Sequence, residues 1–248
     1  MIPKSSPTLL ATLHCDCDAW IQSQQGLIAN ERDMQVMLAM HLIDSKHYDL
    51  VDTEYRVPLT ELVARGVKPG SLSFPWENQL SVDIVVARQG QYAAIELKYA
   101  TTIVDYEFVI FGERMRRKES QIIKNQAASN LTMYNYWKDV RRIETLSRVF
   151  EHVVGGLAII ITNNHTYWKS PRAESNYAAY SMHEGNTVGG GPMKWLSGVS
   201  PKILKSHPHF ELSGLYTCNW HNTKIKVRAT NGDHFKYCIS TITNSKNQ

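Results

Sequence analysis

The sequence predicts an α/β fold, a mixed β-sheet core flanked by helices and followed by a β-rich C-terminal extension. Three patterns support this prediction. Apolar residues recur at helical spacing near the N-terminus, a hairpin of apolar strands follows, and short segments rich in β-branched and aromatic residues fill the C-terminal third. We expect residues 1–165 to form the core and residues 166–248 to form an extension that packs on it without folding independently.

The composition is that of an ordinary globular protein. The chain has 248 residues, 43% of them hydrophobic, and can bury a sizeable core. Its net charge of +4 allows nucleic-acid binding without requiring it, because a local basic patch matters more than the total. Four cysteines without disulfide or zinc spacing predict reduced thiols. The sequence has no signal-peptide core and no apolar run long enough for a membrane span, so we expect a cytoplasmic protein.

Two helices are expected near the N-terminus, over residues 8–25 and 30–46. In the second helix, Glu31 leans toward the core-facing side, and Gln35 shares that face one turn later. An acid on that side needs a partner, which a metal ion would supply. The alternative is a first-turn glutamate that the helix dipole favours. The expected buried stripe of this helix is Met34, Met37, Leu38, His41 and Leu42.

A β-hairpin is predicted over residues 81–100, and it carries charged residues within apolar strands. Asp83 interrupts the first apolar run. In the second strand Glu96 and Lys98 share one face, because side chains alternate along a strand. Charges seldom occupy such runs unless they are paired or bind a cation. The alternative is a cross-strand ion pair on a solvated sheet face, which the apolar neighbours of Asp83 disfavour.

The other expected elements are strands and helices in alternation. We expect strands at 49–59, 105–111 and 153–162, a loop with a helical turn at 60–80, and a long helix at 120–150. In the extension, the glycines at 189–191 are expected to form a plain turn, because no phosphate-binding context surrounds them. Four segments of the extension are expected to be strands, at residues 177–185, 210–221, 223–230 and 235–242.

Asp83, Glu96 and Lys98 resemble the motif of the PD-(D/E)XK nuclease superfamily, which has the restriction-endonuclease-like fold. Its pattern is an acid on one strand, then an acid, any residue and a lysine on the next; Leu97 is the intervening residue, and Val82 replaces the usual proline. Five further segments resemble an uncharacterised bacterial branch of this superfamily. They are NERDMQVMLAMHL, YDLVDTEYRVP, YNYWKDVRRIE, IIITNNHTYW and MHEG.

The resemblance implies a metal-dependent nuclease that hydrolyses phosphodiester bonds, in DNA, with defence or DNA processing as its setting by analogy. It implies Mg²⁺, with Mn²⁺ as a substitute, held by Asp83, Glu96 and the backbone carbonyl of Leu97, with Glu31 as a further ligand. Lys98 would orient or deprotonate the attacking water, or stabilise the pentavalent phosphorane. The alternatives are a non-catalytic nucleic-acid-binding or complex-forming protein on the same fold, or an RNA-directed phosphodiesterase. Three glutamines are candidate accessory residues, Gln35, Gln121 and Gln126.

A basic segment is the candidate nucleic-acid contact. Neutralisation of phosphates by such a strip would make binding dependent on salt and largely independent of sequence. A solvated helix face is the alternative. Cutting of both strands would suggest a homodimer, and no membrane partner is expected. The candidate contact residues are Arg114, Arg116, Arg117, Lys118 and Lys124.

Overall fold

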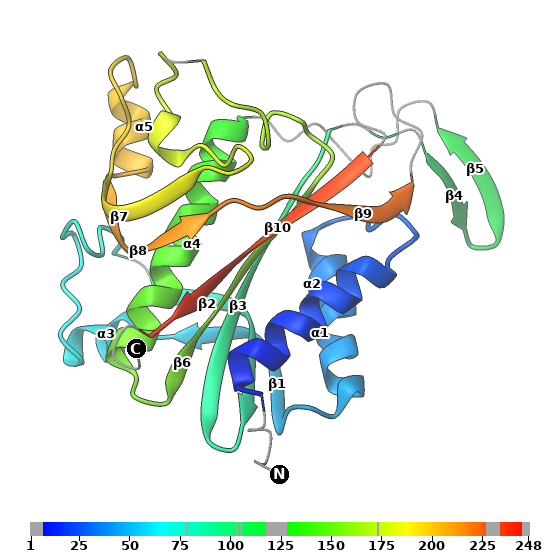
Figure 1. Cartoon of the computed structure of the whole chain (residues 1–248), viewed down its shortest axis with the longest axis horizontal. Coiled ribbons are helices and arrows are strands. Elements are labelled where there is room, and N and C mark those ends of the chain that lie inside the picture. Colours follow the sequence, from blue (N-terminus) through cyan, green and yellow to red (C-terminus); the bar gives the residue numbers. More distant parts are fainter. Residues whose placement is uncertain are drawn as a thin grey trace, which may run out of the picture.

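The computed structural model describes residues 7–77, 79–102, 104, 106–117, 128–172, 174–226 and 234–244. It confirms the α/β class: one six-stranded mixed sheet, in the order β1-β2-β3-β6-β10-β9, is flanked by helices (Figure 1). Within the described ranges, no helix has the length and apolar character needed to cross a bilayer. The strands of this sheet are β1 (Leu50–Val57), β2 (Leu80–Arg88), β3 (Gln91–Ala100), β6 (Val153–Thr162), β10 (His234–Thr243) and β9 (His221–Lys226).

The pairing of the strands puts the predicted hairpin beside the centre of the sheet. β2 and β3 pair in antiparallel fashion, and β3 then pairs with β6 in parallel. A parallel pair needs a crossover connection, and helix α4 (Ser129–Val149) lies within the one between these strands. Close approach of β6 to β3 requires Gly156, because a Cβ there would lie 2.1 Å from the carbonyl oxygen of Ala94.

Helices α1 (Leu9–Ser23) and α2 (Glu31–Ser45) cover one face of the sheet, as Figure 1 shows. Their N-termini are capped by the side chains of Thr8 and Asn30, which accept backbone N–H bonds. Both helices lie where the sequence predicts them. Met37 was predicted to be buried and is 40% exposed, because it lies on the side of α2 that faces away from the sheet.

Helix α4 covers the opposite face of the sheet. Short elements surround it. Within α4, the buried Glu144 carboxylate lies 2.8 Å from Arg141. The same carboxylate connects α4 to β8, because it accepts hydrogen bonds from the backbone of Ser213 and Gly214 and from the Tyr216 hydroxyl. The short elements are α3 (Leu59–Ala64), 3₁₀ helix η1 (Ala178–Tyr180), β7 (Thr187–Met193), α5 (Pro201–Ser206) and β8 (Phe210–Thr217).

Several elements differ from the prediction. Residues 177–185 contain η1 and no strand, and residues 189–191 lie inside β7 and do not form a plain turn. Gly189 is needed there because a Cβ would lie 2.1 Å from the carbonyl oxygen of Gly214 across the β7–β8 pair. The basic residues Arg114, Arg116 and Arg117 lie in β5 (Glu113–Arg117), which pairs with β4 (Tyr106–Ile110). The predicted helix at 120–150 matches α4 from Ser129 onward, and residues 118–127 lie outside the described part of the chain.

Candidate functional site

The candidate site lies where β2 and β3 stop pairing. Their backbone register runs from Arg88 opposite Gln91 to Ile84 opposite Ile95, and the next residues of the two strands are Asp83 and Glu96. At this point the Asp83 Oδ2 atom accepts a hydrogen bond of 2.7 Å from the Leu97 backbone N–H. The carboxylate side chain thus contacts the neighbouring strand at the place where the backbone ladder ends.

The first turns of α2 contribute two polar side chains to the same place. Glu31 Oε2 accepts a hydrogen bond of 2.9 Å from the Tyr99 backbone N–H. Gln35 is buried, and its Nε2 atom donates a hydrogen bond of 2.7 Å to the backbone carbonyl of Asp83. Both contacts arise because the N-terminus of α2, fixed by its Asn30 cap, lies over the ends of β2 and β3.

Helix α4 contributes charged side chains from the other side. The Lys98 Nζ atom lies 2.7 Å from Asp139 Oδ2 and donates a hydrogen bond of 2.8 Å to the Leu97 carbonyl. Arg142 Nη1 lies 3.3 Å from Asp139 Oδ1 and 3.9 Å from Glu96 Oε1. Asp139 and Glu96 are both buried. The site is therefore a compact network in which acids outnumber cations.

Burial dominates the electrostatics of the acids. It raises the pKa of Glu31 and that of Asp83, and the positive charge of Lys98 acts in the opposite direction on both. A hydrogen bond with the Glu96 side chain also lowers the pKa of Asp83, which indicates that these two carboxyl groups lie together. The pKa of Glu96 is raised well above its ordinary value, first by burial and then by Asp139 and Asp83.

Lys98 is held in its charged form. Burial acts to lower its pKa, but the surrounding carboxylates, with Asp139 the strongest, raise it above the ordinary value. The neighbouring Lys138 shows the opposite result: its pKa is lowered, by burial and then by Arg142. The difference arises because Lys98 contacts a carboxylate directly.

The donor set at this site suits a hard divalent cation. Carboxylate oxygens of Glu31, Asp83 and Glu96, with the Leu97 carbonyl, are the ligand types that Mg²⁺ prefers. Within the described chain no hydrogen-bond donor satisfies Glu96 Oε1, a buried oxygen that a cation would satisfy. No group of three or more His, Cys, Asp or Glu side chains among the described residues is already arranged as a metal site. Glu31, Asp83 and Glu96 are therefore not positioned in this structure to hold one ion together.

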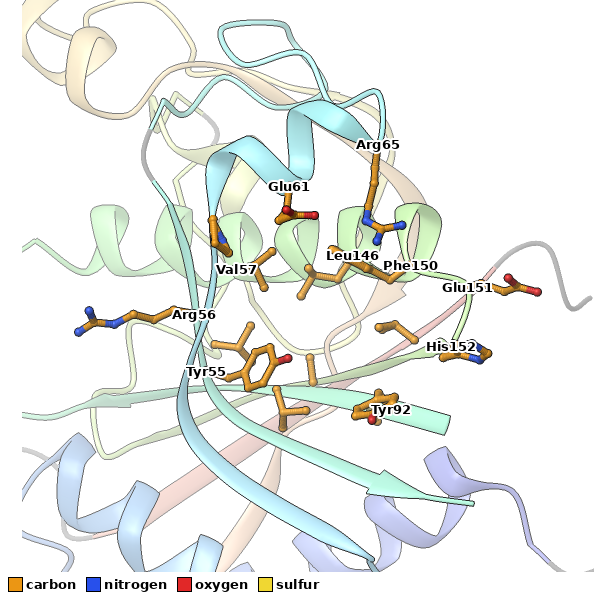
Figure 2. Close-up of a pocket in the computed structure, with 16 residues that line it drawn as sticks. Tyr55, Arg56, Val57, Glu61, Arg65, Tyr92, Leu146, Phe150, Glu151 and His152 are labelled. Carbon is orange, nitrogen blue, oxygen red and sulfur yellow. The ribbon is translucent and has the colours of Figure 1, made fainter. Parts of the chain in front are cut away.

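A cavity of about 510 Å³ lies on the sheet face that carries Asp83 and Glu96, and neither of these acids lines it (Figure 2). Val85 and Ala94 line it, and each lies two residues along its strand from Asp83 or Glu96, on the same sheet face and about 7 Å away. Figure 2 shows Glu61 of α3 and Arg65, the residue that follows this helix, above the cavity. The Arg65 guanidinium carbon lies 4.4 Å from the centroid of the Phe150 ring. The cavity is thus mostly apolar with charged groups at its edge.

The structure describes only part of the predicted basic segment. Arg114, Arg116 and Arg117 lie in β5. Four other predicted residues lie outside the described part of the chain. They are Lys118, Gln121, Lys124 and Gln126.

The prediction from sequence missed Asp139 and Arg142. A signal was present: Asp139 follows Tyr136 by three residues and precedes Ile143 by four, so it lies on the apolar face of its helix. Comparisons of the chain with protein-family models, curated proteins and solved structures gave no match.

Proposed function

We propose that this protein is a metal-dependent nuclease with a restriction-endonuclease-like fold, acting on phosphodiester bonds of DNA. One observation carries the proposal. The buried carboxyl group of Glu96 and the half-buried carboxyl group of Asp83 lie together at the point where two sheet strands stop pairing, and Lys98 follows Glu96 on the same strand face. A solvated cross-strand ion pair is the alternative, and the burial of Glu96 at 4% exposure argues against it.

Each residue has a role in the proposed reaction. Asp83 and Glu96 would hold Mg²⁺, which when bound acidifies a water molecule and neutralises charge on the phosphate. Glu31 would orient that water or add a ligand from the α2 side. Lys98 keeps its proton in the network with Asp139, so we assign it to stabilising the negative charge of the pentavalent phosphorane.

The cavity on the sheet face of the acids favours a polymer as the substrate. A nucleotide next to the cleaved bond has room there, because the cavity shares the strand face of Glu96 and has the size of typical small-ligand sites. The apolar wall suits the face of a base or a sugar, and Arg65 at the edge suits a phosphate or a base edge.

A cleavage assay tests the proposal. Supercoiled, linear and single-stranded DNA, and RNA, are incubated with the protein and Mg²⁺ or Mn²⁺. We expect DNA cleavage that chelation abolishes and that Glu96→Gln lowers by at least about 100-fold, because the substitution removes a ligand of the proposed catalytic cation.

Glu174→Gln is the matched control, because Glu174 is exposed and far from the network in sequence and contacts. Cleavage of RNA alone would reassign the substrate. Equal cleavage by the wild-type protein and Glu96→Gln would refute the assignment of the site. Tight binding of nucleic acid without cleavage under any metal condition would favour a non-catalytic binding protein.

A further inference from the structure

Helix α2 carries an apolar stripe on the side that faces away from the sheet. Its members are Val36, Met37, Met40 and Ile43, which are 50%, 40%, 59% and 50% exposed. Three of them lie at positions i, i+4 and i+7, so they form one continuous strip along the helix. The core-facing side of the same helix is formed by other residues, so this α2 stripe adds nothing to the core of its own chain. Contiguous apolar surface of this kind marks an interaction site.

The charges at the two ends of the α2 stripe indicate which partner it fits. Arg32 lies one turn before Val36, and Asp44 lies one turn after Met40, on the same i±4 row, and both are exposed. Along the helix axis these two opposite charges are equally distant from the level of Leu38, a residue on the opposite, buried side of α2. If a second copy of α2 lay antiparallel on the first, each Arg32 would face an Asp44, and each Val36 would face a Met40. The row is therefore complementary to itself.

We propose that the α2 stripe is the interface of a homodimer in which two α2 helices pack antiparallel. The two-fold axis crosses them at the level of Leu38, midway between Val36 and Met40. A closed two-fold contact uses the same patch on both copies, which a self-complementary row allows. A shallow crossing angle of about 20° keeps contact along the helix. Parallel packing is disfavoured because it would put like charges together at both ends.

The expected strength of the dimer is moderate. Fifteen residues give a helix about 22 Å long, which alone buries less than the roughly 800 Å² per partner of a standard interface. We therefore expect a reversible dimer with a Kd on the order of micromolar.

The dimer also has a consequence for the proposed nuclease, although the dimer itself does not depend on that function. Glu31 and Gln35 lie on the same helix as the α2 stripe and contact the candidate site. Antiparallel packing about Leu38 would place the two Glu31 residues roughly 20 Å apart along the helix axis. Two sites joined in this way would suit cleavage of both strands of a duplex.

Sedimentation equilibrium of the full chain, over a wide concentration range, tests the dimer. We expect the wild-type protein to be a concentration-dependent dimer and Met40→Glu to be a folded monomer, with at least about a 100-fold rise in Kd, because each dimer would bury the new charge twice. Val63→Glu is the control: Val63 is 49% exposed on α3 and should leave the dimer unchanged. A wild-type protein that stays monomeric throughout would overturn the proposal.

A charge exchange tests the antiparallel register. Arg32→Asp and Asp44→Arg should each weaken the dimer, because like charges then meet at both ends. Mixing these two variants should restore a heterodimer, and the double variant should restore the homodimer. Arg32→Asp places a negative charge near the N-terminus of α2, and Asp44→Arg places a positive charge near its C-terminus. Both charges interact favourably with the helix dipole, so we do not expect unfolding to explain a loss of the dimer. If the dimer persists in both single variants, or mixing restores nothing, the proposed register is wrong.

Discussion

Helix α4 takes part in two buried clusters of charge, and the clusters differ in how completely their glutamate carboxylates are hydrogen-bonded. In the first, the Glu144 carboxylate accepts hydrogen bonds from Arg141, from two backbone N–H groups and from the Tyr216 hydroxyl. In the second, Glu96 has a buried oxygen that no described group satisfies, and its nearest cation, Arg142, lies 3.9 Å away.

This difference separates a structural charge pair from a candidate reactive site. The Glu144 cluster ties β8 to α4, and all the hydrogen bonds of its carboxylate come from the protein itself. In the Glu96 cluster, burial and neighbouring acids raise the pKa of the carboxyl group well above its ordinary value. A protein tolerates such a group at a cost in stability, and a bound cation would remove that cost.

The largest expected effect follows from removing each acid in turn. Glu144→Gln leaves the buried Arg141 charge uncompensated and should lower the free energy of unfolding by about 3–5 kcal/mol. In the absence of divalent cations, Glu96→Gln should leave that free energy unchanged or raise it. Chemical denaturation of both variants measures the two effects. The reverse order, with Glu96 more important for stability, would contradict the distinction between the clusters.

A smaller effect is expected from pH. The pKa values of Glu31, Asp83 and Glu96 are raised in the folded protein, so the folded state binds more protons than the unfolded state above the ordinary carboxyl pKa. Without metal, the free energy of unfolding should therefore fall as pH rises above about 4.5, by at most about 1.4 kcal/mol per pH unit for each group.

Denaturation curves at a series of pH values check this dependence. The slope should be shallower in Glu96→Gln and unchanged in Glu174→Gln. A free energy of unfolding that rises with pH over the same range would show that these acids are stabilised in their charged form.

The smallest effect concerns the cavity. Arg65→Ala should raise the KM for a DNA substrate about fivefold, the equivalent of about 1 kcal/mol, with kcat unchanged, because it removes a cation from the edge of the cavity. Arg172→Ala is the matched control, because Arg172 is exposed and does not line the cavity. Equal effects of the two substitutions would mean that only the overall charge matters.

The sequence was sufficient where structure depends on local pattern. Apolar periodicity predicts α1, α2 and β6, and the interrupted hairpin predicts that Asp83 and Glu96 meet, because neighbouring strands joined by a tight turn fix their own register. Met37 was wrongly predicted to be buried because α2 is apolar on two sides and Met37 lies on the exposed one. No rule of local pattern distinguishes the face that packs on the sheet from the face that is left exposed.

The rest of the site depends on contacts between distant parts of the chain. Asp139 meets Lys98 only because the connection between β3 and β6 carries α4 back across the sheet. Likewise, β10 pairs with β6 inside the central sheet although it lies near the C-terminal end of the described chain. Such pairings are set by tertiary packing, so the motif predicted the acids on the strands but not their partners on the helix.

The central claim is that Asp83 and Glu96 together hold a divalent cation. Titration of the protein with Mn²⁺, measured by isothermal calorimetry, tests this claim most directly. Wild-type protein and Glu174→Gln should bind the ion with the same affinity, and Glu96→Gln should bind it at least about tenfold more weakly. Equal binding by all three proteins, or no binding by the wild-type protein, would contradict the claim.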